Sequence, residues 1–368
     1  MKVCVVNLLR LGDLLQSLPL IEELSKRERV TFFIPKLNVL SFLKEIVDCE
    51  IVELDIDGLL ECSKTLNFDR FSYLLGKDRA STFDYAINLN SFELSFYISS
   101  FFGKKVLGVT YDDRKIIKDK QFSLLFNSAD NRKKAPINIS QLYLSYLENI
   151  ENIPVAKNSR SIKNIVINVN TGSSIRNFPN SFYINLIENL KRDYNLFLVG
   201  TDIDKGNEIY SPFTEFENIE NLTGKQSLKE LYQLLVSSDL LISPDTATIH
   251  MAARTEIKIL GLYNISAYYF QTAPFSDAII YIPNRGCYPC NEDFQPCGNR
   301  ECMWDYSGFK VAEIVRKFDT IPGSERLIRQ RRFSDGSLVF EGGNSEEKSL
   351  NNLLVSKFLR DKSGSDQW

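Results

Sequence analysis

The sequence predicts an α/β protein that contains two doubly wound parallel sheets, one after the other along the chain. Its 368 residues exceed what one ordinary hydrophobic core holds. Short apolar runs alternate with helical patterns as far as about residue 283, and the polar segment 151–163 interrupts this alternation. We therefore expect an N-terminal lobe over 1–155, a C-terminal lobe over 160–320 and an extension over 321–368. In such a fold the ligand is expected in the cleft between the lobes.

In the first lobe, short β-branched and aromatic runs predict five strands. They are expected at Val3–Leu8, Val30–Pro35, Glu50–Asp55, Tyr85–Asn90 and Val106–Thr110. Apolar residues at helical spacing predict a helix over Asp13–Lys26, which Pro19 should kink or divide into two. A second helix is expected over Ser140–Asn149.

The same alternation resumes in the second lobe. Strands are expected at Asn164–Asn170, Leu196–Gly200, Leu240–Pro244, Ile257–Tyr263 and Ala278–Pro283, and helices at Ser181–Arg192, Ser227–Ser237 and Thr248–Ala253. Beyond residue 320 the rhythm is lost. There the pattern predicts a small hairpin over Arg332–Glu341 and a terminal helix over Glu346–Lys362.

Composition excludes several classes of protein. Lys plus Arg number 44 against 47 Asp plus Glu, which lacks the basic excess typical of nucleic-acid-binding proteins. The longest apolar runs are too short to span a membrane, and the N-terminal run lacks a cleavage site for export. We therefore expect a cytoplasmic protein, in which the seven cysteines stay reduced.

The first polar motif is Arg10-Leu11-Gly12-Asp13, between the first strand and its helix. In one interpretation Asp13 is only a helix cap, because Asp is favoured where backbone amides lack partners. In the other, its carboxylate faces the cleft and removes a proton from an acceptor hydroxyl. The two interpretations are compatible.

A second motif, Asn170–Pro179, follows the strand that opens the second lobe, and its hydroxyls, glycine and Arg176 suit phosphate binding. The third and strongest is Ser243–Ala253, where a buried strand ends and a short apolar helix begins. Amides in the first turn of that helix would hold a diphosphate. His250, the single histidine of the chain, lies one turn in and could donate to the same anion. The alternative is a histidine that only packs in the core.

These motifs resemble glycosyltransferase family 9, the lipopolysaccharide heptosyltransferases of the GT-B fold. The resemblance rests on Asn221–Leu231 followed by Asp239–Ala253, with matching segments in the same order at Arg10–Pro19, Phe83–Gly108, Thr171–Pro179 and Phe197–Gly200. It covers residues 1 to about 315. It implies a GT-B protein with two Rossmann-like lobes facing across a cleft, which transfers a heptose-type sugar from an ADP-sugar to a carbohydrate acceptor. It also implies inversion at the anomeric carbon and no need for a metal.

The resemblance assigns roles to individual positions. Asp13 matches the catalytic base of the family, and Thr171 and Arg176 match residues that hold the donor phosphates. The motif that clasps the nucleotide diphosphate is matched by Asp245, Thr246, Ala247 and His250. This chain differs from the family in carrying Ala247 for Gly, Arg176 for Lys and Phe178 for Trp, and these changes bear on donor identity.

Four cysteines follow the last strand of the second lobe. Cys287, Cys290, Cys297 and Cys302 have the spacing C-x2-C-x6-C-x4-C. Four thiols this close could bind a structural zinc or iron ion, and similar clusters occur in the resembled family. The alternative is that they remain thiols. A metal bound there would stabilise the loop and would take no part in sugar transfer.

The expected partners are ADP-heptose as the donor and a glycolipid or oligosaccharide of the lipopolysaccharide core, or a related surface glycan, as the acceptor. The basic run Arg326–Arg332 could contact anionic lipid headgroups at the cytoplasmic face of the inner membrane or a phosphorylated acceptor, and the alternative is a solvated surface. No G-x-G-x-x-G follows a predicted strand, which argues against a nicotinamide dehydrogenase. Two other functions stay open: a protein O-heptosyltransferase, and a repurposed nucleotide-sugar binder without activity.

Overall fold

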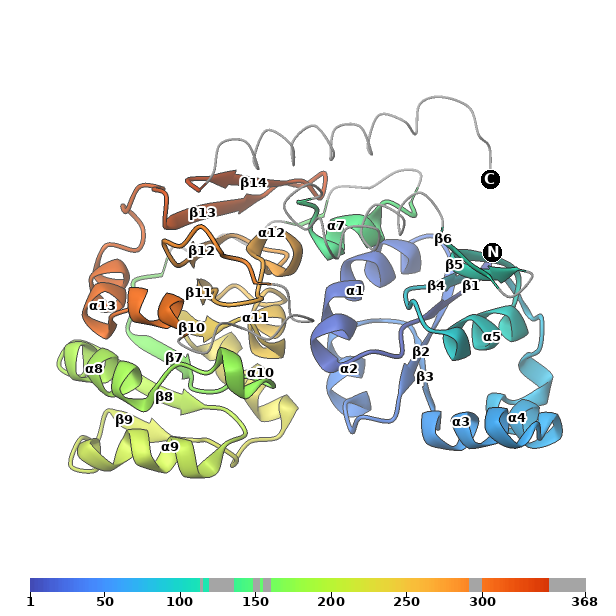
Figure 1. Cartoon of the computed structure of the whole chain (residues 1–368), viewed down its shortest axis with the longest axis horizontal. Coiled ribbons are helices and arrows are strands. Elements are labelled where there is room, and N and C mark those ends of the chain that lie inside the picture. The colour runs from blue at the N-terminus through green and yellow to red at the C-terminus, as the bar shows by residue number, and fades with distance from the viewer. Residues whose placement is uncertain (113–114, 119–135, 148–152, 155–159, 291–299, 344–368) are drawn as a thin grey trace. The chain divides into compact units, whose positions relative to one another are not determined.

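The computed structural model describes residues 1–112, 115–118, 136–147, 153–154, 160–290 and 300–343. These residues divide into two compact units. Unit one contains the described residues up to 118 together with 139–147, and unit two contains 136–138 and 153–343. Each unit is a largely parallel sheet flanked by helices, as Figure 1 shows. The expected α/β class is confirmed.

The described strands of unit one form one sheet in the order β3-β2-β1-β4-β5-β6. The strands are β1 (Lys2–Val6), β2 (Arg29–Pro35), β3 (Glu50–Leu54), β4 (Phe83–Asn88), β5 (Gly103–Asp112) and β6 (Lys115–Lys118). All neighbours pair in parallel except β5 and β6. The chain runs outward from β1 to β3 and then returns to β4 on the other side of β1. The topological switch point of this sheet therefore lies between β1 and β4.

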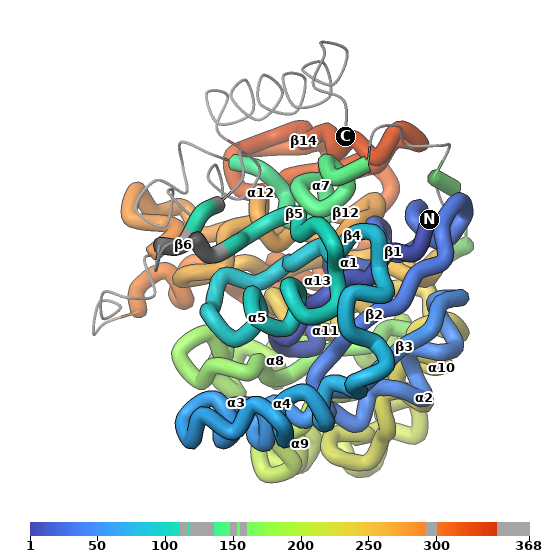
Figure 2. Tube along the Cα trace, turned by 90° about the vertical axis from the view of Figure 1, so that its right-hand side faces the viewer, coloured from blue at the N-terminus to red at the C-terminus, as the bar shows by residue number. Residues whose placement is uncertain are grey.

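Helices cover both faces of this sheet. They are α1 (Leu11–Ser25), α2 (Leu40–Ile46), α3 (Ile56–Thr65), α4 (Phe68–Leu75), η1 (Lys77–Arg79), α5 (Glu93–Phe102) and α7 (Ile139–Leu144). One core joins β1, β2 and β4 to α3, α4 and α5, and in it Phe33 stacks on Phe102 with 4.0 Å between ring centroids. Figure 2 shows α3 and α4 side by side at one end of this unit.

Helix α1 forms because its apolar residues recur at helical spacing and are buried along one side. Pro19 lies inside this helix, and the helix continues through it to Ser25. Of the two expected alternatives, the one in which Pro19 opens a new helix is therefore wrong. Proline fixes a φ that a helix accepts, and packing of the apolar side compensates for the lost backbone hydrogen bond.

Unit two contains a sheet with the order β14-β13-β12-β11-β10-β7-β8-β9. Its strands are β7 (Asn164–Asn168), β8 (Asn195–Val199), β9 (Ile219–Asn221), β10 (Leu240–Pro244), β11 (Lys258–Leu262), β12 (Ala278–Tyr281), β13 (Leu327–Arg332) and β14 (Leu338–Glu341). From β9 to β12 all pairs are parallel, in the doubly wound order typical of dinucleotide-binding folds. The switch point here lies between β7 and β10.

The helices of unit two are η3 (Ser174–Arg176), α8 (Asn180–Leu190), α9 (Ile203–Tyr210), η4 (Ser211–Phe213), α10 (Leu228–Ser237), α11 (Ala247–Ala252), α12 (Tyr269–Thr272), η5 (Glu301–Asp305) and α13 (Gly308–Arg316). Residues of α8, α9 and α13 share one core with β7, β8, β10, β11 and β12. These helices therefore cover one face of the sheet. Helix α10 begins with a capping box, in which Ser227 and Glu230 each satisfy the other's backbone amide.

The extension expected over 321–368 is partly a component of unit two. Strands β13 and β14 pair antiparallel, and β13 also pairs antiparallel with β12. The hairpin is longer than expected from Arg332–Glu341, because its first strand begins at Leu327. The expected terminal helix over 346–362 and most of the polar segment 151–163 lie outside the described residues. No helix in the described ranges has the length and apolar character needed to cross a bilayer.

Candidate functional site

The strongest sequence motif lies at the switch point of unit two. Strand β10 ends at Pro244, and β7 ends at Asn168. Because β7 and β10 are parallel neighbours, the loops that leave their carboxyl ends start at the same edge of the sheet. The loop after β7 carries Thr171 and Arg176, and the loop after β10 carries Asp245 and Thr246. The fold thus brings the second and third sequence motifs together.

Asp245 is the centre of this arrangement. One of its carboxylate oxygens, Oδ2, lies 3.3 Å from Arg176 Nη1 and accepts a hydrogen bond from Thr272 Oγ1 at 3.1 Å. Its other oxygen, Oδ1, lies 3.9 Å from His250 Nε2. The side chains of Asp245 and Arg176 are 10% and 18% exposed, so water screens their attraction only partly. Asp245 therefore holds the guanidinium group in place between two elements of the unit.

The loop after β7 has an internal scaffold. Asn177 accepts a hydrogen bond from the Thr171 amide at 2.7 Å, and the Thr171 hydroxyl donates to the Ser173 carbonyl at 2.6 Å. The same hydroxyl accepts from the Ser173 amide at 3.2 Å. The loop ends in η3, whose last residue is Arg176. Thr171 is buried in this position, so it shapes the loop that presents Arg176.

The start of α11 is held by a buried asparagine. Asn168 donates to the hydroxyl of Thr246 at 2.9 Å and to that of Thr248 at 3.1 Å. Thr246 is the N-cap residue of α11, but its side chain makes no capping hydrogen bond. Its hydroxyl instead accepts the hydrogen bond from Asn168. Ala247 is the first residue of the helix and is half-buried.

His250 is buried inside α11, with 5% of its surface exposed. Burial lowers the pKa of its imidazole from 6.5 to about 4. The ring is therefore neutral near pH 7, and its approach to Asp245 is not an ion pair under those conditions. A neutral imidazole can still donate one hydrogen bond.

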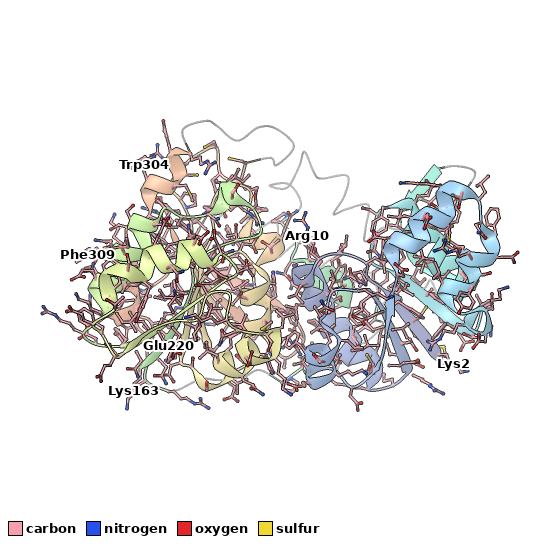
Figure 3. All side chains as sticks on the ribbon, turned by 90° about the horizontal axis from the view of Figure 1, so that it is seen from below. Lys2, Arg10, Lys163, Glu220, Trp304 and Phe309 are labelled. Atoms are coloured by element: carbon pink, nitrogen blue, oxygen red, sulfur yellow. The ribbon has the colours of Figure 1, made fainter. Side chains whose placement is uncertain are left out.

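Asp13 lies at the switch point of unit one. Arg10 is the N-cap residue of α1, so Asp13 is the third residue of the helix and not its cap. Burial raises the pKa of the Asp13 carboxyl, whereas hydrogen bonding from the backbone at Arg10 and the charge of Arg10 oppose that rise. Arg10 itself is exposed and is labelled in Figure 3. A half-buried carboxylate of raised pKa at this position suits proton abstraction.

Several residues that hold these groups were not predicted from the sequence. Thr272, on α12, binds Asp245, and Asn264 donates to the Arg176 carbonyl at 3.1 Å. Asn168 organises the start of α11. The signal for Asn168 was present in the sequence: Asn168-Val169-Asn170 ends a strand in the same way as Asn88-Leu89-Asn90 in unit one. Thr272 had no such signal, because it reaches the site only through the fold.

The cysteine cluster is only partly described. Cys287 is exposed, Cys290 is half-buried and Cys302 is buried, whereas Cys297 lies outside the described residues. Within the described ranges, no group of three or more His, Cys, Asp or Glu side chains is placed to hold a metal ion. The three described thiols are therefore not gathered into such a group.

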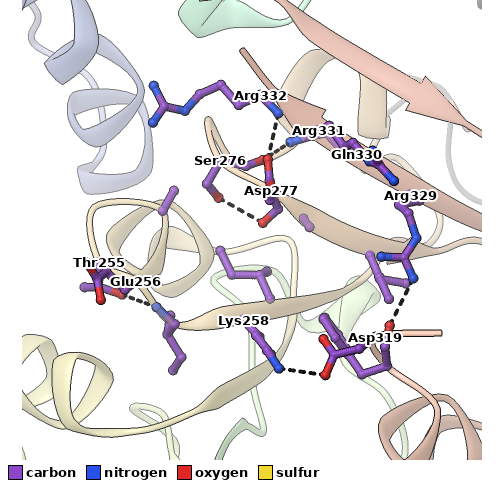
Figure 4. A pocket seen from close by; sticks show the side chains of 16 residues that line it. Thr255, Glu256, Lys258, Ser276, Asp277, Asp319, Arg329, Gln330, Arg331 and Arg332 are labelled. Atoms are coloured by element: carbon purple, nitrogen blue, oxygen red, sulfur yellow. Dashed lines mark hydrogen bonds and ion pairs between the residues drawn. The ribbon is translucent and has the colours of Figure 1, made fainter. Parts of the chain in front are cut away.

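Two cavities lie away from these motifs. One, of about 160 Å³, opens beside Lys258 and Ala278, the first residues of β11 and β12, and is shown in Figure 4. There Lys258 Nζ donates to Asp319 at 2.9 Å and to the Arg160 carbonyl at 2.8 Å. The other, of about 200 Å³ in unit one, is lined by apolar side chains such as Val3 and Leu24. Neither cavity is lined by a residue predicted for the donor site or as the base.

Comparison with known proteins identifies the family. The model of glycosyltransferase family 9 (heptosyltransferase) matches residues 109–299. The lipooligosaccharide heptosyltransferase 2 of Campylobacter jejuni subsp. jejuni serotype O:6 is 23% identical over 246 residues, which cover 63% of this chain and 77% of that protein.

Solved structures agree in fold. The E. coli ADP-heptose lipopolysaccharide heptosyltransferase II has a TM-score of 0.60 at 17% identity, covering 86% of this chain and 98% of its own. The E. coli heptosyltransferase WaaC with ADP has a TM-score of 0.57 at 13% identity, covering 86% and 99%. These likenesses establish the GT-B fold, with its two Rossmann-like units. Since the family model also spans more than half of the residues, the chain belongs to glycosyltransferase family 9 and is a glycosyltransferase.

Proposed function

We propose that this glycosyltransferase moves a heptose-type sugar from ADP-heptose to a carbohydrate acceptor of the lipopolysaccharide core or a related surface glycan. The observation that carries the proposal is the placement of polar groups at both switch points. One carries a carboxylate of raised pKa, and the other carries a fixed guanidinium group beside a helix start. The names of the relatives support the substrates: a lipooligosaccharide heptosyltransferase, an ADP-heptose lipopolysaccharide heptosyltransferase and a heptosyltransferase with ADP.

In this proposal the donor diphosphate binds at the switch point of unit two. Arg176 supplies a charged fork, and the backbone amides at the start of α11 supply further donors near Thr246 and Ala247. Asp245 would repel a phosphate group, so its role is to hold Arg176 rather than to contact the anion. His250 is neutral and contributes at most one N–H.

Asp13 is the base of the proposed reaction. Its carboxylate takes the proton of the acceptor hydroxyl, while the hydroxyl oxygen forms a bond to the anomeric carbon. The bond from that carbon to the phosphate oxygen breaks, and ADP leaves with the electron pair. Attack from the face opposite the leaving group inverts the anomeric centre. Preorganised donors around the diphosphate stabilise its developing charge, so this reaction needs no metal ion.

A donor and acceptor screen tests the proposal. We expect ADP-heptose, offered with heptose-deficient lipopolysaccharide core oligosaccharide, to give a product one heptose heavier by mass spectrometry. ADP release should equal product formation and should persist in EDTA. ADP-glucose, GDP-mannose and UDP-glucose should react much more slowly.

Three results would overturn parts of this assignment. A UDP-sugar as the best donor would reject the ADP-heptose donor. Transfer to a protein hydroxyl but not to the oligosaccharide would make the chain a protein O-heptosyltransferase. Binding of ADP-heptose without any turnover would make it a nucleotide-sugar binder.

A further inference from the structure

Three asparagines are buried at the carboxyl ends of β1 and β4, and the proposed chemistry uses none of them. Asn7, Asn88 and Asn90 each have 0% of their surface exposed. A buried amide destabilises the fold unless its hydrogen-bonding groups are satisfied. Here they are satisfied by one another, by the backbone of β1 and β5, and by the backbone of the segment that leads to Asp13.

Asn90 extends the pairing of β1 and β4 beyond the end of β1. Its Oδ1 accepts from the Leu8 amide at 2.8 Å, and its Nδ2 donates to the Val6 carbonyl at 2.8 Å. Nδ2 also donates to Asn88 Oδ1 at 3.0 Å. Asn88 in turn donates to the Val109 carbonyl at 2.9 Å. The start of the loop after β1 is therefore tied to two neighbouring strands.

The side chain of Asn7 bonds to two points of the same loop and of the helix that follows it. Its Oδ1 accepts from the Leu9 amide at 3.2 Å, and its Nδ2 donates to the backbone carbonyl of Asp13 at 3.1 Å. Its own amide donates to the Phe33 carbonyl on β2 at 3.1 Å. One side chain thus connects the end of the strand directly to the first turn of α1.

We propose that Asn7 and Asn90 are positioning residues, which fix the loop 7–12 and thereby aim the Asp13 carboxylate. This inference rests on the proposed function, in which Asp13 is the base. The physical reason is that proton abstraction needs the carboxylate within hydrogen-bond reach of the acceptor hydroxyl. A displacement of about 1 Å can cost about 100-fold in rate. Satisfied buried amides resist such a displacement more strongly than apolar contacts, because their hydrogen bonds are directional.

The test measures kinetics of the full chain with ADP-heptose and heptose-deficient core oligosaccharide. We expect Asn90→Ala and Asn7→Ala to lower kcat by about 10- to 100-fold. The KM for ADP-heptose and the Kd for ADP should change less than about twofold, because the variants leave the binding groups in unit two unchanged. Unchanged kcat in both folded variants would overturn the inference.

A double-mutant cycle separates positioning from simple stabilisation. In an Asp13→Asn background, the same alanine substitutions should change the residual rate less than about twofold, because no base remains to be aimed. An equal loss in both backgrounds would show a merely structural role. Should an alanine variant not fold, Asn90→Ser and Asn7→Ser, which keep one polar group, are compared in the same cycle and judged by the same criterion.

Asn218→Ala is the matched control. Asn218 also donates two hydrogen bonds to backbone carbonyls, those of Lys191 and Tyr194, both at 2.7 Å. It directly precedes β9, which is an edge strand of the sheet in unit two. Asn218→Ala should lower Tm and leave kcat unchanged. The two proposals fail separately: full activity of Asp13→Asn rejects the base, whereas a loss in Asp13→Asn with no loss in the asparagine variants rejects only the positioning role.

Discussion

In both units, asparagines lie where the central strands end. The functional groups that these asparagines hold differ between the units. In unit one, Asn90 and Asn7 bond mainly to the backbone, and the loop they hold presents one carboxylate. In unit two, Asn168 bonds to hydroxyl groups at the start of α11, beside a guanidinium group held by Asp245. One sheet topology thus offers equivalent positions for different tasks. A rigid loop suits a base, whereas an array of donors suits an anion.

Replacing Asp13 should have the strongest consequence, and it tests whether unit one supplies the chemistry but does not bind the donor. Asp13→Asn should lower kcat by about 10²- to 10⁴-fold, the range for loss of a general base, and leave the Kd for ADP nearly unchanged. It should not lower Tm, because burial raises the pKa of Asp13 and the ionised form therefore destabilises the fold at neutral pH. Steady-state kinetics, calorimetric titration and thermal unfolding measure these three quantities.

Asp57→Asn serves as the control for Asp13. Asp57 is exposed and lies in the first turn of α3, so like Asp13 it is in the first turn of a helix, but it is not buried. Its substitution should leave kcat unchanged. A clearly higher Kd for ADP in Asp13→Asn would show that unit one also contributes to donor binding.

The next effect concerns the acid stability of unit two. His250 has a pKa of about 4 in the folded chain against 6.5 for an ordinary histidine. As the pH falls from 6.5 towards 4, the unfolded chain takes up the proton first, so stability is lost over that window. The loss amounts to about 3 kcal/mol. Chemical unfolding of wild type and His250→Gln at a series of pH values should show this component only in wild type, since the chain has no other histidine. Parallel curves for the two proteins would mean that His250 titrates normally.

Substitutions of Arg176 test the proposed donor site and should have a smaller effect. Arg176→Ala should weaken ADP binding by about 10- to 100-fold, in line with about 1.5–3 kcal/mol for a charged hydrogen bond. Arg176→Lys should weaken ADP binding less, because lysine keeps the positive charge although it lacks the two-pronged guanidinium group. Arg285→Ala, which removes an exposed arginine paired with Asp305, is the control and should bind ADP normally. Equal binding by all three variants would remove Arg176 from the donor site.

Much of the fold was predictable from the sequence. Strand β10 matched its expected bounds, Leu240–Pro244, because a buried parallel strand is a continuous apolar run. Helices α3 and α4 were missed, since their apolar faces are short. Strand β13 was missed because Arg329 and Arg331 make it look like a solvated basic run, although Ile328 and Gln330, which alternate with them along the strand, are buried.

The site was predictable only in part. The motifs after β1, β7 and β10 could be found because they follow strands, and the strand order then brings the last two together. The groups that hold them could not be found, because a hydrogen bond between distant residues depends on register. Gly200 illustrates this point. Its φ is +148°, and a Cβ there would lie 2.1 Å from Asn170 Oδ1, a contact that no local pattern reveals.

The antiparallel hairpin of β13 and β14 has a consequence for the solubility of unit two. Strand β12, with its buried sequence Ala278–Tyr281, would otherwise form the edge of a parallel sheet. An apolar edge strand is a template for pairing with other chains. The hairpin replaces that edge with β14, which spans only Leu338–Glu341, and it places Arg331 beside Glu341. A chain cut before residue 327 would therefore expose a surface prone to aggregation, even though each residue of the motifs after β7 and β10 would remain.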